Sequence, residues 1–188
     1  MAGPQGQHSF APSQFMAKVD KLGGIARKNR FSIEITPPST LVSGIQASTI
    51  NFLAKTVSFP ARAFGTTTYR SGGQFGLEVP YEATFEPMSV TMLNTNDYAP
   101  RIFWTDWLEH IQNMNTYNMQ YYKKFIGTIK IQTYSEDQTL ATTPKHEVTL
   151  HEAWPKSMGS IELGWEASDL AEFDIDIAYS WWTGPSNA

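Results

Sequence analysis

Residues 59–93 read FPARAFGTTTYRSGGQFGLEVPYEATFEPMSVTML, and most of this stretch has the composition and alternation of β-structure. Its first part, Ala61 to Gly76, joins β-forming residues (Thr66 to Tyr69) to glycines at both ends. That composition favours a long β-hairpin that projects from the body of the protein. A projecting hairpin must pair with another surface or risk indiscriminate edge association. The hairpin is therefore a candidate contact between subunits.

The second part of the stretch alternates apolar and polar residues with a period of two, which is the mark of a β-strand. Between Gln74 and Glu86 one face carries Phe75, Leu77, Val79, Tyr81 and Phe85. The opposite face carries Glu78, Glu82 and Glu86. Pro80 indicates a sheet edge or a bulge. Met88, Val90 and Met92 continue the alternation into a further strand.

The same alternation predicts strands on both sides of this stretch. Residues 30–36 place three apolar side chains on one face before Pro37 and Pro38 end the run. Residues 125–134 and 146–153 form two more runs, separated by the turn-rich residues 135–144. The last apolar stripe comprises Phe173, Ile175, Ile177, Tyr179 and Trp181. The face opposite that stripe carries Glu172, Asp174 and Asp176.

Only two segments show helical spacing. Between Pro100 and Met114, apolar residues recur every three or four positions, and Asn96 or Asp97 can cap the first amides. A shorter amphipathic stretch runs from Phe15 to Leu22, after a flexible arm of Gly, Pro, Gln and Ser. The sequence therefore predicts a mainly β protein with one helix packed on its side. We expect an N-terminal arm at 1–27, a β-domain at 28–183 and a short tail at 184–188.

Composition makes assembly a possibility. The 188 residues suffice for one domain, and only 17% are charged, against roughly 25% in an average soluble domain. A chain this poor in charge can bury much of its surface against other subunits. The net charge of −4 argues against a protein that binds nucleic acid through its phosphates. For the two basic clusters, Arg27-Lys28-Arg30 and Lys123-Lys124, a solvated or interface role is favoured over a nucleic-acid site. No apolar run approaches the roughly 18 residues of a membrane helix, so no membrane contact is expected.

Motifs for catalysis or cofactor binding are missing from the sequence. Without cysteine there is no thiolate metal ligand or cysteine nucleophile, and Ser71-Gly72-Gly73 lacks the lysine of a phosphate-binding loop. His146 and His151 are five residues apart, which on a strand places them on opposite faces. A polar strand edge is therefore favoured over a metal site. Packing is favoured over sugar stacking for most of the six tryptophans. We predict no catalytic residue, cofactor or metal.

The acidic residues allow several interpretations. Glu172, Asp174 and Asp176 could form a solvated sheet face, the lining of a channel, or a hydrolytic or metal site. Catalysis needs a general acid and base with distinct environments, and the row implies no such pair. If strands from several subunits closed into a pore, its electronegative wall would repel DNA, which suits a conduit. The candidate acidic lumen residues are Glu78, Glu82, Glu172, Asp174 and Asp176.

Five runs of sequence, taken in order, resemble the tail tube proteins of T-even-type contractile-tailed phages. They are NRFSIEITPP (29–38), the stretch 59–93, RIFWTDWLEHI (101–111), HEAWPKSMGSIELGW (151–165) and FDIDIAYSWW (173–182). Together they cover about residues 28–182, nearly the whole chain. No single run is specific, but the ordered set is.

The resemblance implies an antiparallel β-sandwich or barrel with one flanking helix, whose inner strands join a multi-subunit β-barrel. Six copies would form a ring, and rings would stack into a hollow tube without enzymatic activity. The implied partners are other copies, the tail sheath protein, a baseplate tube initiator, and the tape measure protein and DNA that pass through the lumen. The implied location is the virion tail, assembled in the host bacterial cytoplasm. The hairpin residues expected at the contacts are Phe64, Thr66, Thr67, Thr68, Tyr69 and Arg70.

Other functions remain open at this stage. A baseplate tube initiator or a type VI secretion ring protein would share the ring architecture. A carbohydrate-binding β-sandwich would explain the aromatic content alone. An acid hydrolase would explain only the clustered carboxylates. Neither of the last two explains the long Thr-rich hairpin.

Overall fold

The long strand β7 (His146–Met158) organises the molecule. A computed structural model describes residues 12–21, 24–70, 72–73, 75–135, 144–166 and 168–185. In it, the first half of β7 pairs with β6 (Gly127–Thr133) and the second half with β8 (Glu172–Ala178). The strand bends at Glu152, whose φ of 55° lies in the left-handed region. β7 therefore joins the two halves of one seven-stranded sheet.

All strand pairs of the body are antiparallel. The sheet order is β1-β6-β7-β8-β5-β2, and the short β9 (Trp181–Thr183) pairs with β7 as well. The edge strands are β1 (Phe31–Thr36) and β2 (Ala54–Val57), while β5 (Met88–Leu93) lies between β2 and β8. The expectation of a mainly antiparallel β-fold is confirmed. The last apolar stripe, however, is split between β8 and β9, because the chain leaves the ladder at Tyr179 and Ser180.

The core lies where the apolar faces of these strands meet α3 (Ala99–Ile111). Alternate residues of β1, β5 and β8 are buried, as the period of two predicts. The buried set includes Ile33, Ile35, Met88, Val90, Met92, Ile129, Ile131, Val148, Leu150, Phe173, Ile175 and Ile177. From α3, Trp104 and Trp107 enter this core with stacked rings 5.4 Å apart. Packing is therefore the role of these two tryptophans, as predicted.

The predicted helix between Pro100 and Met114 is confirmed, although it ends at Ile111. Its cap differs from the prediction. The hydroxyl Oγ1 of Thr95 accepts a hydrogen bond of 3.3 Å from the backbone N–H of Ala99. Asn96 and Asp97 are therefore wrong as caps, because Tyr98 takes a left-handed conformation (φ 53°) that places Thr95 over the helix start.

Several short helices complete the body. α2 (Ala47–Ile50) and the 3-10 turn η1 (Asn51–Leu53) lead into β2, and α4 (Tyr122–Phe125) leads into β6. At the start of β6, a Cβ added to Gly127 would lie 2.5 Å from the Thr36 carbonyl oxygen and 2.9 Å from the Trp107 ring. Only glycine allows β6 to pass this close to α3.

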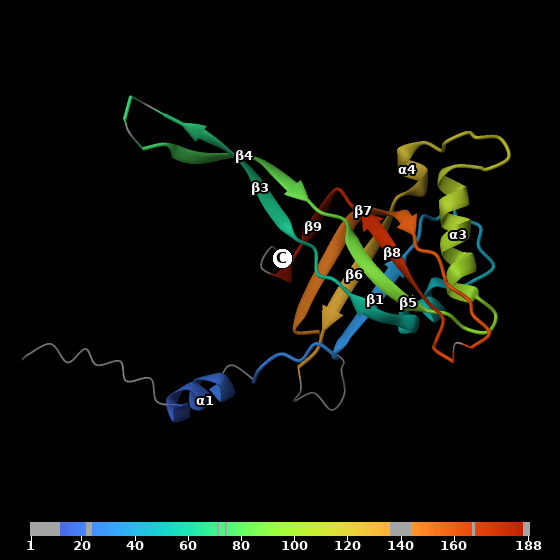
Figure 1. Cartoon of the computed structure of the whole chain (residues 1–188), viewed down its shortest axis with the longest axis horizontal. Coiled ribbons are helices and arrows are strands. Elements are labelled where there is room, and N and C mark those ends of the chain that lie inside the picture. The colour runs from blue at the N-terminus through green and yellow to red at the C-terminus, as the bar shows by residue number, and fades with distance from the viewer. Residues whose placement is uncertain are drawn as a thin grey trace, which may run out of the picture.

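Two segments stand away from the body (Figure 1). One is the helix α1 (Pro12–Lys21), all of whose residues are at least partly exposed. The short N-terminal helix is thus confirmed, but it begins at Pro12, inside the stretch expected to be flexible; residues 1–11, 22 and 23 lie outside the described residues. Most of the predicted turn-rich segment (136–143) and most of the C-terminal tail (186–188) also lie outside them.

The other projecting segment is a hairpin of β3 (Arg62–Tyr69) and β4 (Leu77–Phe85), which form a separate two-stranded sheet. We call it the arm. The sequence predicted the arm within residues 61–76 and assigned the following strand to the body. That boundary is wrong: the strand is the second leg of the arm. Its two legs continue directly into β2 and β5, which pair with each other in the body.

Candidate assembly surfaces

The described residues contain no group of three or more His, Asp or Glu side chains that could hold a metal ion. The two histidines of β7 have separate environments. His146 lies opposite Thr133 of β6, whereas His151 stacks on Trp181 at 5.1 Å and shares a hydrogen bond of 3.0 Å with the Thr183 hydroxyl. Neither histidine lies on an edge strand, because β7 pairs with β6, β8 and β9.

The three carboxylates of β8 form a ladder along one face, as predicted. Each binds a side chain from another strand of the sheet. The Lys55 ammonium donates to Glu172 at 2.5 Å, the Thr91 hydroxyl to Asp174 at 2.7 Å and the Ser157 hydroxyl to Asp176 at 2.7 Å. Because these partners are one cation and two hydroxyls, the ladder keeps a net negative charge. This face can repel a polyanion.

Glu78 and Glu82 lie elsewhere, on the arm. The structure does not bring them together with the β8 ladder (Figure 1). It also separates them from each other. Glu82 pairs with Gly65, and Glu78 pairs with Thr68, three residues further along β3 and so on the opposite face. The prediction that they share a face is wrong because a bulge leaves Tyr81 without a partner on β3.

Gly65 lies beside the bulge. A Cβ at this position would meet the Tyr81 ring at 3.0 Å, so glycine lets that ring lie across β3. The sequence had indicated a sheet edge or a bulge at Pro80, and the bulge lies one residue away, at Tyr81. The bulge reverses the alternation of side chains in β4, so that residues on either side of it occupy opposite faces from those expected of a regular strand. Beyond it, Thr67, Tyr69, Leu77 and Val79 occupy one face and Thr66, Thr68 and Glu78 the other.

The arm exposes apolar side chains over much of its length. Phe64, Tyr69, Leu77 and Tyr81 are each more than half exposed, at 54%, 62%, 65% and 68%. The remaining predicted contact residues, Thr66, Thr67, Thr68 and Arg70, are exposed as well. An exposed apolar surface on a chain with few charges is typical of a surface that another molecule covers.

The base of the arm is held by Tyr179. Its ring lies 6.0 Å from that of Phe85, and its hydroxyl donates a long hydrogen bond of 3.5 Å to the Ala61 carbonyl. Partial burial raises the pKa of Tyr179 above its ordinary value, and the negative charge of Glu86 raises it further. The neutral phenol is therefore the form that fixes the arm to the body.

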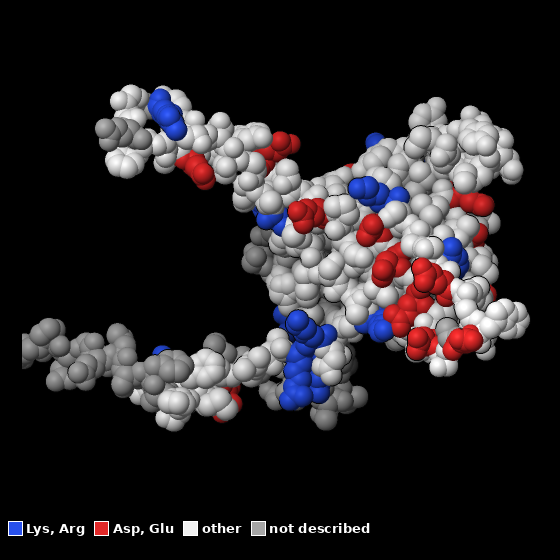
Figure 2. Space-filling model, viewed as in Figure 1, with Lys and Arg blue, Asp and Glu red and all other residues white. Residues whose placement is uncertain are grey.

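A groove of about 1080 Å³ opens between the edge strands β1 and β2. Its lining includes Ile25, Phe31, Val57, Phe59 and Ile131, which are apolar. The basic residues of the lining are Arg27, Lys28, Arg30, Lys55 and Lys145. Among the lining residues, all of which are described, there is no carboxylate. In Figure 2, basic side chains gather where the chain enters β1, and acidic side chains gather over β8 and the loop before it. We call the groove between β1 and β2 the basic groove.

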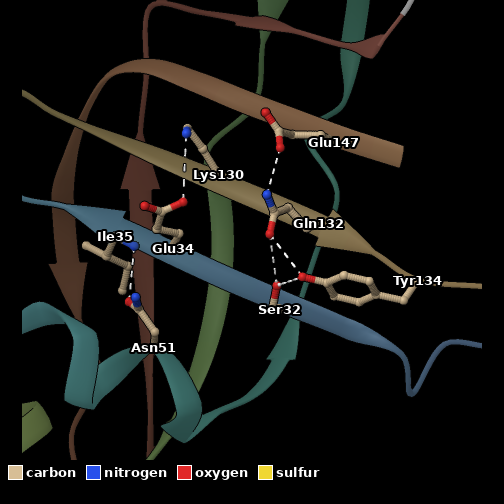
Figure 3. A network of polar contacts seen from close by, with 8 residues as sticks. All are labelled: Ser32, Glu34, Ile35, Asn51, Lys130, Gln132, Tyr134 and Glu147. Carbon is tan, nitrogen blue, oxygen red and sulfur yellow. Dashed lines mark hydrogen bonds and ion pairs between the residues drawn. The ribbon is translucent and has the colours of Figure 1, made fainter. Parts of the chain in front are cut away.

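A polar network fixes the edge strand β1 to its neighbours (Figure 3). Gln132 of β6 donates to the Glu147 carboxylate at 2.7 Å and accepts hydrogen bonds from the hydroxyls of Ser32 and Tyr134. The side-chain oxygen of Asn51 accepts a hydrogen bond of 3.1 Å from the backbone N–H of Ile35. Cross-strand contacts of this kind stabilise strand register. The network is structural, and it also occupies part of an otherwise open edge.

A second polar cluster lies at the bend of β7, and sequence reasoning did not find it. The hydroxyls of Tyr122 and Ser180 donate to the Glu152 carboxylate at 3.0 and 2.6 Å. Partial burial raises the pKa of Tyr122. The hydrogen bond between Tyr122 and Ser180 lowers this pKa, and the hydrogen bond and negative charge of Glu152 raise it. The residues are 28 to 58 positions apart, so no local pattern could have revealed them. The cluster joins α4 and the end of β8 to the bend.

Comparison with known proteins gives three kinds of similarity. Residues 26–184 match the family model described as phage tail tube protein. A curated protein of Serratia phage KSP90, described as "Tail tube protein", is 24% identical over 169 residues, which cover 89% of this chain and 93% of the relative.

Similar solved structures include proteins of extracellular contractile injection systems. The chain superposes on a protein of a PVC sheath/tube terminator with a TM-score of 0.62 at 15% identity, covering 85% of this chain and 96% of the other. For a protein of a PVC sheath-tube complex the TM-score is 0.61 at 15% identity, with 94% and 98% covered. At such identities these superpositions show a shared fold.

Proposed function

Because this chain belongs to the phage tail tube protein family, we propose that it forms hexameric rings that stack into the hollow inner tube of a contractile tail. The observation that carries the proposal is the family match over residues 26–184, together with an arm whose apolar surface is uncovered in the single chain. A subunit that assembles can cover such a surface, whereas a monomer cannot. In this proposal, 28–183 is the tube-forming β-domain, flanked by an assembly arm at 1–27 and a tail at 184–188.

The proposed role is structural, and its partners follow from the place of a tube in a tail. Other copies are the main partner. Solved structures with this fold include members of a sheath-tube complex and of a baseplate, which supports contacts with a sheath protein and a baseplate tube initiator. DNA and a tape measure protein would pass through the lumen without specific binding. The protein would reside in the virion tail after assembly in the host bacterial cytoplasm.

We propose that the β8 ladder faces the lumen. Glu172, Asp174 and Asp176 share one face and keep a net negative charge against their partners. Such a wall would repel the phosphate backbone of DNA and keep it from adhering. Glu78 and Glu82 are weaker candidates, because the bulge places them on opposite faces of the arm. A cryo-EM reconstruction of the tube that placed the β8 carboxylates on its outer surface would rule this out.

Assembly can be tested first by negative-stain electron microscopy and sedimentation of the purified chain over a range of concentrations. Stacked rings or hollow tubes of uniform width are expected. Preformed tubes added as seeds would distinguish slow initiation from inability to assemble. A subunit that stays monomeric even with seeds would contradict the proposal.

The arm can be tested by replacing residues 64–83 with an Asn-Gly turn, which keeps the pairs Arg62–Phe85 and Ala63–Thr84. We expect folded subunits that fail to form tubes. A milder variant is Tyr69→Ser on the arm, matched by Tyr121→Ser, because both tyrosines are exposed and Tyr121 lies on the body. Tubes of normal yield from the shortened variant would show that the arm is not an assembly contact.

A further inference from the structure

The loop between β7 and β8, residues 159–171, exposes large apolar side chains outside the arm. Leu163 is 78% exposed, Leu170 is 75% exposed and Trp165 is fully exposed. The loop also carries Glu162, Glu166 and Asp169, and its sequence GSIELGWEASDLA contains no lysine or arginine. We call it the acidic loop. Trp165 lies between Glu162 and Glu166 in the sequence. Its fully exposed ring lowers the solubility of the protein unless another surface covers it.

The basic groove has the opposite charge and a similar apolar character. Ile131 is buried within its lining, and Phe31, Val57 and Phe59 add further apolar surface. Of its cations, Lys55 already binds Glu172 at the margin, so Lys28 and Lys145 are better candidates to meet a new carboxylate. At about 1080 Å³ the groove has room for several side chains, since pockets of about 300–1,000 Å³ enclose a drug-sized ligand.

We propose that the acidic loop of one subunit docks into the basic groove of the next, with Trp165 as the anchor. The inference rests on the proposed function and deepens it, because it specifies two surfaces of the ring contact. A contact between two different surfaces of one chain is head-to-tail, and such contacts close into rings when the rotation permits. A tryptophan seated near lysine and arginine side chains also gains cation–π attraction.

Charge selects the acidic loop over the other exposed apolar segments. The arm carries Arg62 and Arg70 against Glu78 and Glu82, so it has no net charge to match the groove. The helix α1 carries Lys18 and Lys21 against Asp20, so it has the same sign as the groove. None of the loop residues lines the groove within its own chain. The groove and the acidic loop therefore match as surfaces of two copies.

The decisive test uses the natural absence of cysteine. Glu166→Cys and Lys145→Cys are introduced together into the full chain, which is oxidised mildly under assembly conditions and analysed on a non-reducing gel. We expect a covalent ladder that ends in a closed oligomer. Mixing the two single variants should give covalent dimers only, because each pair then holds one reactive contact. The matched control pairs Lys145→Cys with Glu109→Cys, an exposed glutamate on α3.

A second measurement checks the anchor without a cross-link. Trp165→Ser should weaken subunit association about tenfold or more, as expected of a hot-spot tryptophan, and added salt should weaken the wild-type contact in the same direction. If wild-type rings form but the Glu166–Lys145 pair cross-links no more than the control, the docking proposal fails and the tube function stands. If the ladder appears but no rings or tubes form, the contact stands and the tube function fails.

Discussion

Gly127 sits where β6 passes beneath α3, in space that a methyl group cannot share. An added Cβ would meet the Thr36 carbonyl oxygen at 2.5 Å and the Trp107 ring at 2.9 Å. We expect Gly127→Ala to lower the free energy of unfolding by about 1–3 kcal/mol, since over-packing forces backbone shifts. Urea denaturation of the shortened-arm variant, which should remain monomeric, measures this. Gly44→Ala is the matched control, because a Cβ there has nothing within 4 Å; equal losses at both sites would contradict the packing argument.

Tyr179 gives the base of the arm a dependence on high pH. Its pKa is raised by burial and then by Glu86, so the folded state holds the phenol proton more tightly than the unfolded chain. Below the ordinary value of 10.0 both states are protonated and the contribution is constant. As pH rises above that value, the unfolded chain ionises first and stability falls until the folded pKa is passed.

Tyr179→Phe removes this component, so the variant should lose less stability between about pH 9 and pH 11 than the wild type. Tyr122, whose pKa is also raised, keeps its own share of the loss in both proteins. Denaturant titrations at the two pH values compare them. An identical loss in variant and wild type would show that Tyr179 ionises as freely in the folded chain as in the unfolded one.

At the residue scale, the sequence predicts burial well and sites poorly. Ile33, Val90 and Ile175 are buried because strict alternation identifies a strand face without reference to the rest of the chain. Glu78 and Glu82 were misplaced because a single unpaired residue, Tyr81, reverses the alternation. Lys28 and Lys145 line the same groove only because of the tertiary fold, and no local sequence pattern contains that information.

The start of α3 allows a test of which residue caps the helix. Thr95, rather than Asn96, binds the first amide of α3. We expect Thr95→Ala to cost about 0.5–2 kcal/mol of unfolding free energy, the usual range for a lost cap. Asn96→Ala should be close to neutral by the same chemical denaturation. A larger loss for the asparagine variant would restore it as the cap.

Element boundaries were predictable where proline or periodicity marks them and uncertain elsewhere. Pro37 and Pro38 end β1 where expected. β7, in contrast, runs on to Met158 through Trp154 and Pro155, because the strand changes partner there from β6 to β8. The predicted arm ended too early, at Gly76, because its glycines were taken to mark its two ends. In the structure, Gly72, Gly73 and Gly76 belong to its tip.

The whole molecule has a packed body and two projecting segments, which should differ in resistance to protease. We expect trypsin to cut the free subunit after Arg70 at the tip of the arm and after Lys18 or Lys21 in α1, and to leave the body intact. Incorporation into tubes should protect Arg70 strongly. Mass spectrometry of timed digests locates the cuts. Equal cleavage after Arg70 in subunits and tubes would mean that the arm stays uncovered.

Fold class was predictable for the whole chain, but its topology was not. Strand alternation, one helix and low charge suffice for a mainly β subunit that assembles. The strand order depends on pairs such as β1 with β6, in which Ser32 and Gln132 are 100 positions apart. Local patterns contain no information on such distant pairings. The resemblance of ordered motifs, and not periodicity, supplied the expected architecture.

The continuity of the arm with β2 and β5 has a mechanical consequence. If the arm connects subunits as proposed, an axial load on the tube pulls on the arm, and the pull passes along the covalent backbone into β5. The hydrogen bonds between β5 and β8 run across the strands, so this force shears the ladder as a unit and does not unzip it bond by bond. The arm is thus tethered to a ladder whose hydrogen bonds carry the load together.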